Sequence, residues 1–179
     1  ILGSLLLVLK LKTMEASTGS TSLAALFDKI KDIKICMLTT TESDGKLRSR
    51  PMATVSSDEE TGEIWFFTNE YSAKVDEINK AEEINIAYAD LADDLYVSIS
   101  GTAEVVIDHE KMSQLWNPIY KSWFPEGLED PKLALLRNVP SQAEYWDAPS
   151  NKAIQIFGMA RALVTGEEFN QGENKKFNF

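Results

Sequence analysis

The chain has 179 residues, of which 18 are Lys or Arg and 28 are Asp or Glu, so its formal net charge is −10. This length allows one domain, which buries roughly 70% of the surface that the unfolded chain exposes. The acidic balance argues against nucleic acid or an anionic membrane surface as a partner, and any anion site must therefore be local.

The first thirteen residues are an apolar run with no basic start, no cleavage site and too few residues to cross a bilayer. We expect residues 1–13 to be an upstream extension or an added segment, with a docked helix as the alternative. The domain is expected over 14–170, and the polar tail over 171–179 is expected to be frayed. The single cysteine, Cys36, excludes an internal disulfide and indicates a buried side chain in a cytoplasmic protein, with a reactive thiol as the less favoured alternative.

Helical spacing follows Ser22, a plausible N-cap, and places five apolar residues on one face: Leu23, Leu26, Phe27, Ile30 and Ile33. From residue 35 the period changes to two, which predicts a strand over 35–41, a turn containing Gly45, and a returning strand over 47–56. The next predicted strand, 64–68, carries bulky side chains on both faces. It must therefore be covered on both sides.

A short helix is predicted near Ser72, and a strand over 84–89 follows it. Residues 95–108 alternate cleanly and predict a long strand, after which Asp108 can cap a helix that Pro118 interrupts. Pro131 to Arg137 suggests a further short helix. Two last strands are predicted over 142–147 and 154–164. Consecutive hairpins without regular strand-helix-strand alternation predict an α+β fold built on a closed antiparallel sheet.

The window from Arg48 to Lys74 gathers the residue types that bind a phosphate. The returning strand places Arg48 and Arg50 on one face, the next strand ends at Thr68, and a helix opens at Ser72. Guanidinium, lysine, hydroxyl and helix-terminal amide donors together suit an anion. The alternative is that both arginines are solvated and Ser72 is only an N-cap.

Motifs in this order resemble the pyridoxamine 5′-phosphate oxidase-like FMN-binding split-barrel family, and more closely its general stress protein 26 branch. The resemblance covers roughly Ser22 to Gly172. Its motifs are Arg50-Pro51-Met52-Ala53-Thr54, Trp65-Phe66-Phe67-Thr68-Asn69, Ser72-Ala73-Lys74, Gly101-Thr102-Ala103-Glu104, Ala143-Glu144-Tyr145-Trp146-Asp147 and Thr165-Gly166-Glu167.

The resemblance implies a flavin site. Arg50 and Lys74, helped by Ser72, would hold the flavin phosphate, and Phe67 and Thr68 would lie beside the ribityl chain and ring. The segment that would line the isoalloxazine consists of Arg50, Pro51, Met52, Ala53 and Thr54. Independently of the family, three tryptophans could stack on a flavin, although aromatic residues more often fill cores and interfaces. Trp116 is the strongest candidate, ahead of Trp123 and Trp146.

The family fold also implies a homodimer with the flavin between subunits. Two departures limit the transfer of activity. The only histidine, His109, is far in sequence from Arg161, so pyridoxamine phosphate oxidation is not expected, and Tyr96 stands where the oxidase has a flavin-binding glutamine. One His and one Cys cannot build an ordinary zinc site, so we expect no metal.

Three functions follow. The first is an FMN-dependent oxidoreductase, with FAD as the alternative cofactor, acting on an unknown small substrate. The second is a flavin-binding module that buffers or senses flavin without turnover. The third is a split barrel that binds another ligand, such as haem or a deazaflavin. Neither a membrane nor a nucleic acid is expected as partner, and dinucleotide-fold, P-loop and hydrolase motifs are absent from the sequence.

Overall fold

The computed structural model describes residues 23–42, 44–69, 83–148, 161 and 173–179. Their strands are β1 (Ile35–Thr41), β2 (Leu47–Ser57), β3 (Ile64–Asn69), β4 (Glu83–Asp90), β5 (Leu95–Val106), β6 (Leu133–Asp147) and β7 (Glu173–Asn178). Their helices cover 23–30, α3 (His109–Leu115), and the short 3-10 turns η1 (Pro118–Ser122) and η2 (Gly127–Glu129). The predicted helix near Ser72, the segment 1–13 and, except for residue 161, the predicted strand over 154–164 lie outside the described residues.

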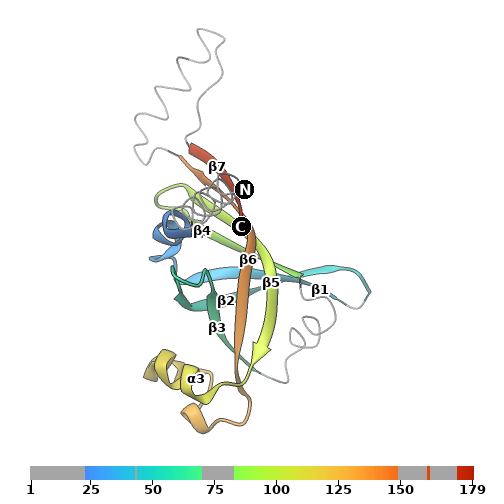
Figure 1. Cartoon of the computed structure of the whole chain (residues 1–179), viewed down its shortest axis with the longest axis vertical. Coiled ribbons are helices and arrows are strands. Elements are labelled where there is room, and N and C mark those ends of the chain that lie inside the picture. The colour runs from blue at the N-terminus through green and yellow to red at the C-terminus, as the bar shows by residue number, and fades with distance from the viewer. Residues whose placement is uncertain (1–22, 43, 70–82, 149–160, 162–172) are drawn as a thin grey trace, which may run out of the picture.

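The sheet closes on itself. Its order is β3-β2-β1-β4-β5-β6-β7, every pairing is antiparallel, and β3 also pairs with β6, which closes β1 to β6 into a barrel. The predicted closed antiparallel α+β fold is confirmed. Strand β6 runs along β5, contacts β3 through Leu133–Asn138 and contacts β7 through Gln142–Asp147. In Figure 1, β7 lies at one end of β6 and α3 lies near the other end.

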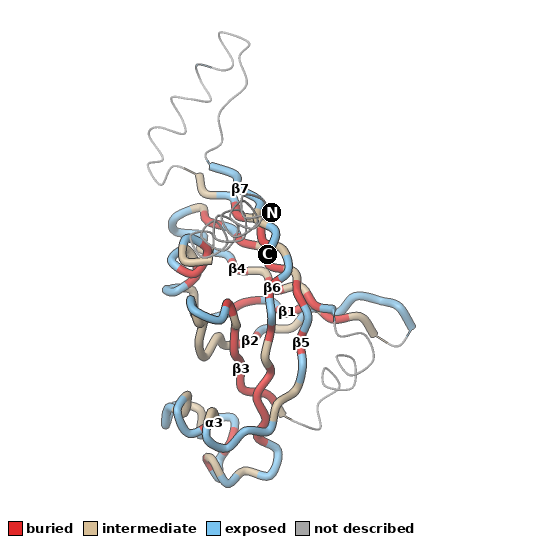
Figure 2. Tube along the Cα trace, in the orientation of Figure 1, coloured by how far each residue is buried: buried red, intermediate tan, exposed pale blue. Residues whose placement is uncertain are grey.

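Two apolar clusters lie on opposite faces of β3. Phe66 points into the barrel, whose core also receives Leu26 and Phe27 from the first helix. Trp65 and Phe67 point outward into a second cluster that α3, η1 and η2 cover. Figure 2 shows most of β3 and of the adjoining part of β6 as buried, and Ile64 to Thr68 and Leu133 to Leu136 are all buried. The expectation that this strand is covered on both sides is therefore confirmed.

Local signals in the sequence mark the predicted boundaries. The Asp108 carboxylate accepts hydrogen bonds from the backbone N–H groups of Glu110 and Lys111, both at 3.0 Å, and so caps α3. Gly45 has a φ of +84°, which the hairpin turn between β1 and β2 requires. None of the helices in the described residues has the length and hydropathy needed to cross a membrane.

Two local expectations are wrong. The short helix expected over 131–137 is instead the start of β6, where Leu133 to Leu136 are all buried. These residues are good helix formers, but they pair with β3 on one side, and Leu135 and Leu136 also pair with β5. Tertiary pairing thus overrides intrinsic propensity. The frayed tail is also wrong for 173–178, which form β7, where Phe177 packs on the Tyr145 ring with centroids 5.9 Å apart.

The register of β5 against β6 shifts between Ser100 and Gly101. A substitution at Gly101 therefore tests how closely the two strands pack in the barrel. A Cβ at Gly101 would lie 2.3 Å from the Val139 carbonyl oxygen. We expect Gly101→Ala to lower the free energy of unfolding by about 1 to 3 kcal/mol, measured by urea denaturation. The control is the exposed neighbour Thr102, because Thr102→Ala should change the free energy of unfolding by less than about 0.5 kcal/mol. Equal stability of the two variants would contradict the close backbone contact.

Candidate functional site

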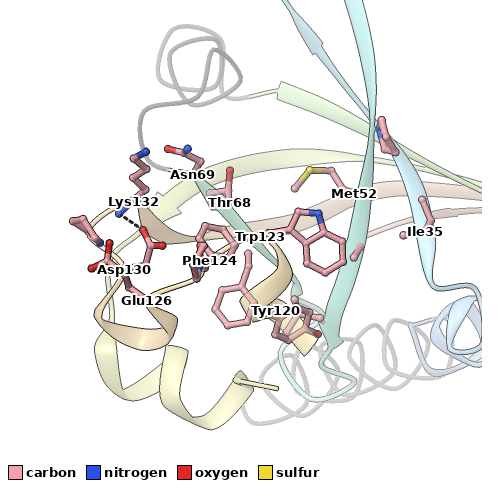
Figure 3. A pocket seen from close by; sticks show the side chains of 16 residues that line it. Ile35, Met52, Thr68, Asn69, Tyr120, Trp123, Phe124, Glu126, Asp130 and Lys132 are labelled. Atoms are coloured by element: carbon pink, nitrogen blue, oxygen red, sulfur yellow. Dashed lines mark hydrogen bonds between the residues drawn. The ribbon is translucent and has the colours of Figure 1, made fainter. Parts of the chain in front are cut away.

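A cavity of about 640 Å³ lies between the outer face of β2, the end of β3 and the η1–η2 segment (Figure 3). Its strand wall consists of Ile35, Pro51, Met52, Ala53, Val55, Phe67, Thr68 and Asn69. Its outer wall consists of Tyr120, Trp123, Phe124, Pro125, Glu126, Asp130, Pro131 and Lys132. The volume is in the usual range for small-molecule and cofactor sites.

The register of the strands explains why the cavity is there. Strand β2 pairs with β3 only from Thr54 to Ser57, whereas β3 pairs with β6 along its whole length. The β2–β3 ladder therefore opens beyond Thr54, and the residues on its two sides, Pro51–Ala53 and Phe67–Asn69, line the cavity. A proline is tolerated at this position in β2 because no β3 residue pairs with it.

Thr68 is the buried polar residue of the strand wall. The side chain is 2% exposed, and its Oγ1 has no hydrogen-bond partner within the described structure. A buried hydroxyl without a partner costs roughly 1 to 3 kcal/mol. Because Thr68 lines the cavity, a polar ligand atom there would remove this cost.

The two arginines of β2 have different surroundings. Arg48 pairs with Glu42 at 3.1 Å, and its side chain is largely exposed. Arg50 is half-buried, and its Nη1 donates to the buried Thr40 hydroxyl at 3.0 Å. The alternative that both arginines are solvated therefore fits Arg48 but does not fit Arg50. Arg50 is not one of the residues that line the cavity, but it directly precedes Pro51, which is.

Neutral polar groups inside the barrel form hydrogen bonds to β2. The hydroxyls of Thr54 and Tyr88 are 2.9 Å apart, and the Cys36 thiol donates to the Met52 carbonyl oxygen at 3.5 Å. Burial raises the pKa of Cys36 to about 11 and raises the pKa of Tyr88 as well. Both groups are therefore neutral near pH 7, and Cys36 is a buried structural residue, as predicted, with no thiolate character.

Of the tryptophans, Trp123 lines the cavity and Trp116 does not. Trp116 packs edge-on against Phe67, with ring centroids 5.5 Å apart, and belongs to the apolar cluster on the outer face of β3. Trp146 lies on β6, opposite Tyr96 on β5. The prediction from the sequence placed Trp116 ahead of Trp123, because only the tertiary placement of η1 distinguishes the two.

Tyr96 is not one of the residues that line the cavity. It pairs with Ala89 on β4, and β4 pairs with β1, whose Ile35 does line the cavity. Tyr96 is 42% exposed, so it is accessible to another molecule.

The structure brings together five of the predicted site residues in one cavity: Pro51, Met52, Ala53, Phe67 and Thr68. Arg50 and Thr54 flank them on β2, whereas Ser72 and Lys74 lie outside the described residues. Sequence reasoning did not assign Glu126, Asp130 or Lys132, which follow an irregular turn without any periodic signal. Within the described ranges, no three His, Cys, Asp or Glu side chains are grouped so that they could hold a metal ion.

A family model described as pyridoxamine 5′-phosphate oxidase like matches residues 21–170. The chain belongs to the pyridoxamine 5′-phosphate oxidase-like family. Among curated relatives, Protein bli-3 of Neurospora crassa is 31% identical in an alignment of 143 residues that covers 75% of this chain and 68% of that protein. Membership of the family confirms the resemblance seen in the sequence.

Solved structures of this family share the fold. One described as a general stress protein 26 from Jannaschia sp. CCS1 superposes with a TM-score of 0.68 at 26% identity, covering 86% of this chain and 95% of its own. The general stress FMN/FAD binding protein of Xanthomonas citri superposes with a TM-score of 0.60 at 31% identity, covering 69% and 86%. The pyridoxamine 5′-phosphate oxidase-like chain is thus similar to the general stress protein branch.

Proposed function

We propose that the chain binds FMN in the cavity at the β2–β3 opening. The observation that carries this proposal is the buried, unpartnered Thr68 hydroxyl beside an open strand ladder. A flavin has a flat apolar ring system with polar edges and a polar side chain, which suits a cavity of this composition. The Xanthomonas citri neighbour, described as FMN/FAD binding, supports a flavin over haem or a deazaflavin.

The residues of the strand wall have separable roles in this proposal. Pro51 to Ala53 would contact the isoalloxazine, and Thr68 would meet a polar atom of the flavin. Arg50 would hold the phosphate, with Ser72 and Lys74 added from the family resemblance. Since one phosphate satisfies this donor set, we propose FMN ahead of FAD.

Bound flavin would supply reversible electron transfer, and the protein would orient the ring and exclude water. We propose redox chemistry on a small substrate, with flavin storage or sensing as the second candidate. Reduction of the bound flavin by NADH or NADPH, followed by rapid reoxidation with one specific acceptor, would support an enzyme. Slow reoxidation by every acceptor would support the non-catalytic binder.

Removal of the phosphate ligands is expected to weaken FMN binding. Arg50→Ala and Lys74→Ala should each cost about 1.5 to 3 kcal/mol, the scale of a hydrogen bond to a charged group. Fluorescence titration with FMN measures the affinity, and saturation near one flavin per chain is expected for the unsubstituted protein. Arg48→Ala is the matched control, because this exposed arginine two residues away pairs with Glu42. Unchanged affinity in both site variants would reject the assignment.

Thr68→Val should have opposite effects on folding and binding. Removal of the unpartnered hydroxyl should raise the free energy of unfolding of the flavin-free chain by about 1 to 2 kcal/mol. The same change should weaken FMN binding by about 0.5 to 1.5 kcal/mol. The control, Thr40→Val, should destabilise the flavin-free chain because it removes the buried hydroxyl that accepts a hydrogen bond from Arg50. Stronger FMN binding by Thr68→Val would contradict a polar contact at this residue.

We further propose a homodimer with the cavity near the subunit interface. Ile35 and Met37 are exposed on the outer face of β1, and Tyr96 is exposed on β5. Sedimentation velocity should give a species of twice the 20.0 kDa chain mass. A 20.0 kDa species at micromolar concentration would refute the dimer.

A further inference from the structure

The aromatic rings of the outer wall differ in exposure, and Trp123 is the most exposed of them. Tyr120 packs edge-on against Phe67 with ring centroids 4.9 Å apart, and Phe124 is buried. Trp123 also lines the cavity, yet 64% of its surface is exposed and it makes no ring contact with another described aromatic residue. In Figure 3 the Trp123 indole lies between Met52 and Tyr120. The ring therefore has an open face available to a ligand.

This exposure is informative because the neighbouring rings of the outer wall are covered, Phe124 fully and Tyr120 partly. Single exposed apolar residues are common, but a large aromatic ring exposed in a cavity is a typical binding residue. Tryptophan offers a broad flat surface with few rotatable bonds, and flat rings pack well against it. Ile119 provides the contrast: it lies on the same turn with the same 64% exposure but does not line the cavity.

The charges on the outer wall restrict the kind of ring that fits. Glu126 and Asp130 both line the cavity, and Lys132 is the one basic side chain among the lining residues that the structure describes. One Asp130 carboxylate oxygen accepts from the Lys132 backbone N–H at 3.0 Å, a turn contact that leaves the carboxylate charge in place. With a chain net charge of −10, the outer wall disfavours an anion.

We propose that the outer wall is a second subsite, which holds a flat aromatic molecule without negative charge against Trp123. The proposal rests on the proposed function, in which the flavin occupies the strand wall, and it gives the class of the small substrate: planar, aromatic, and neutral or cationic. The Thr68 hydroxyl belongs to the strand wall and stays assigned to the flavin, so the second subsite is argued from Trp123 and the charges of the outer wall. Trp123, Glu126 and Asp130 determine the specificity of this subsite.

Two dyes of similar tricyclic shape and opposite charge test the subsite. The full chain, saturated with FMN, is titrated with thionine, a cation, and with ionised resorufin, an anion, while dye absorbance and anisotropy are followed. Thionine should bind about fivefold or more tightly than resorufin at low salt, and added salt should reduce the difference. Equal affinities for the two dyes at low salt would overturn the charge selectivity.

Variants separate stacking from charge. Trp123→Ala should weaken thionine binding about fivefold, whereas Trp123→Phe should restore most of the affinity and Ile119→Ala should leave it unchanged. The double change Glu126→Gln and Asp130→Asn should bring the thionine and resorufin affinities to within about twofold of each other. An unchanged thionine affinity in Trp123→Ala would overturn the proposal.

The order of addition distinguishes this proposal from the flavin site. If FMN displaces thionine in equal amounts, there is no separate subsite and the inference fails while the flavin site stands. If the unsubstituted chain binds no FMN, the proposed function fails, and the same dye titrations on the flavin-free chain still decide the role of Trp123. Retention of thionine by the FMN-saturated chain supports two subsites in one cavity.

Discussion

A strand can pair with only two neighbours, and β3 is paired with β6 along its entire length. The pairing with β6 closes the barrel, while the pairing with β2 is limited to the first three residues of β3. The end of β3 and the facing part of β2 are therefore held close together without a continuous ladder between them. The cavity, the position of Thr68 and the exposure of β2 toward a ligand all depend on this arrangement.

The same strand connects the two apolar clusters. Phe66 packs in the barrel, and Phe67 carries the rings of Trp116, Tyr120 and Phe124 on the other face. The outer wall of the cavity is thus anchored to the strand wall through Phe67. Neutral hydrogen bonds from Thr54 and Cys36 hold β2 without placing a charge in the barrel.

Sequence alone predicted the elements whose signals are local. Period-two alternation located β1, β2 and β5, and Asp108 located the start of α3. The bulky residues on both faces of β3 predicted that this strand is covered on both sides. Residues 50–54 and 67–68 were predicted as one site from the family resemblance, and the structure places them on the adjacent strands β2 and β3. These residues are grouped in the predicted site and are also neighbours in the fold.

The remaining features depend on contacts between distant segments. Leu133 to Leu136 have a helical composition and form a strand only because β3 and β5 provide pairing partners. Strand β7 is polar and is held mainly by its pairing with β6. The difference between Trp116 and Trp123 arises from the course of the chain after Pro118, which no periodicity encodes.

The unsatisfied hydroxyl of Thr68 lies on a strand shared by both cores, so the ligand-free fold carries an energetic defect near its centre. A ligand that binds only the folded chain adds stability that grows with the ratio of its free concentration to its Kd. Molecules without ligand would unfold more often and be degraded first. The cellular amount of the protein would then follow the supply of its ligand, even with constant synthesis.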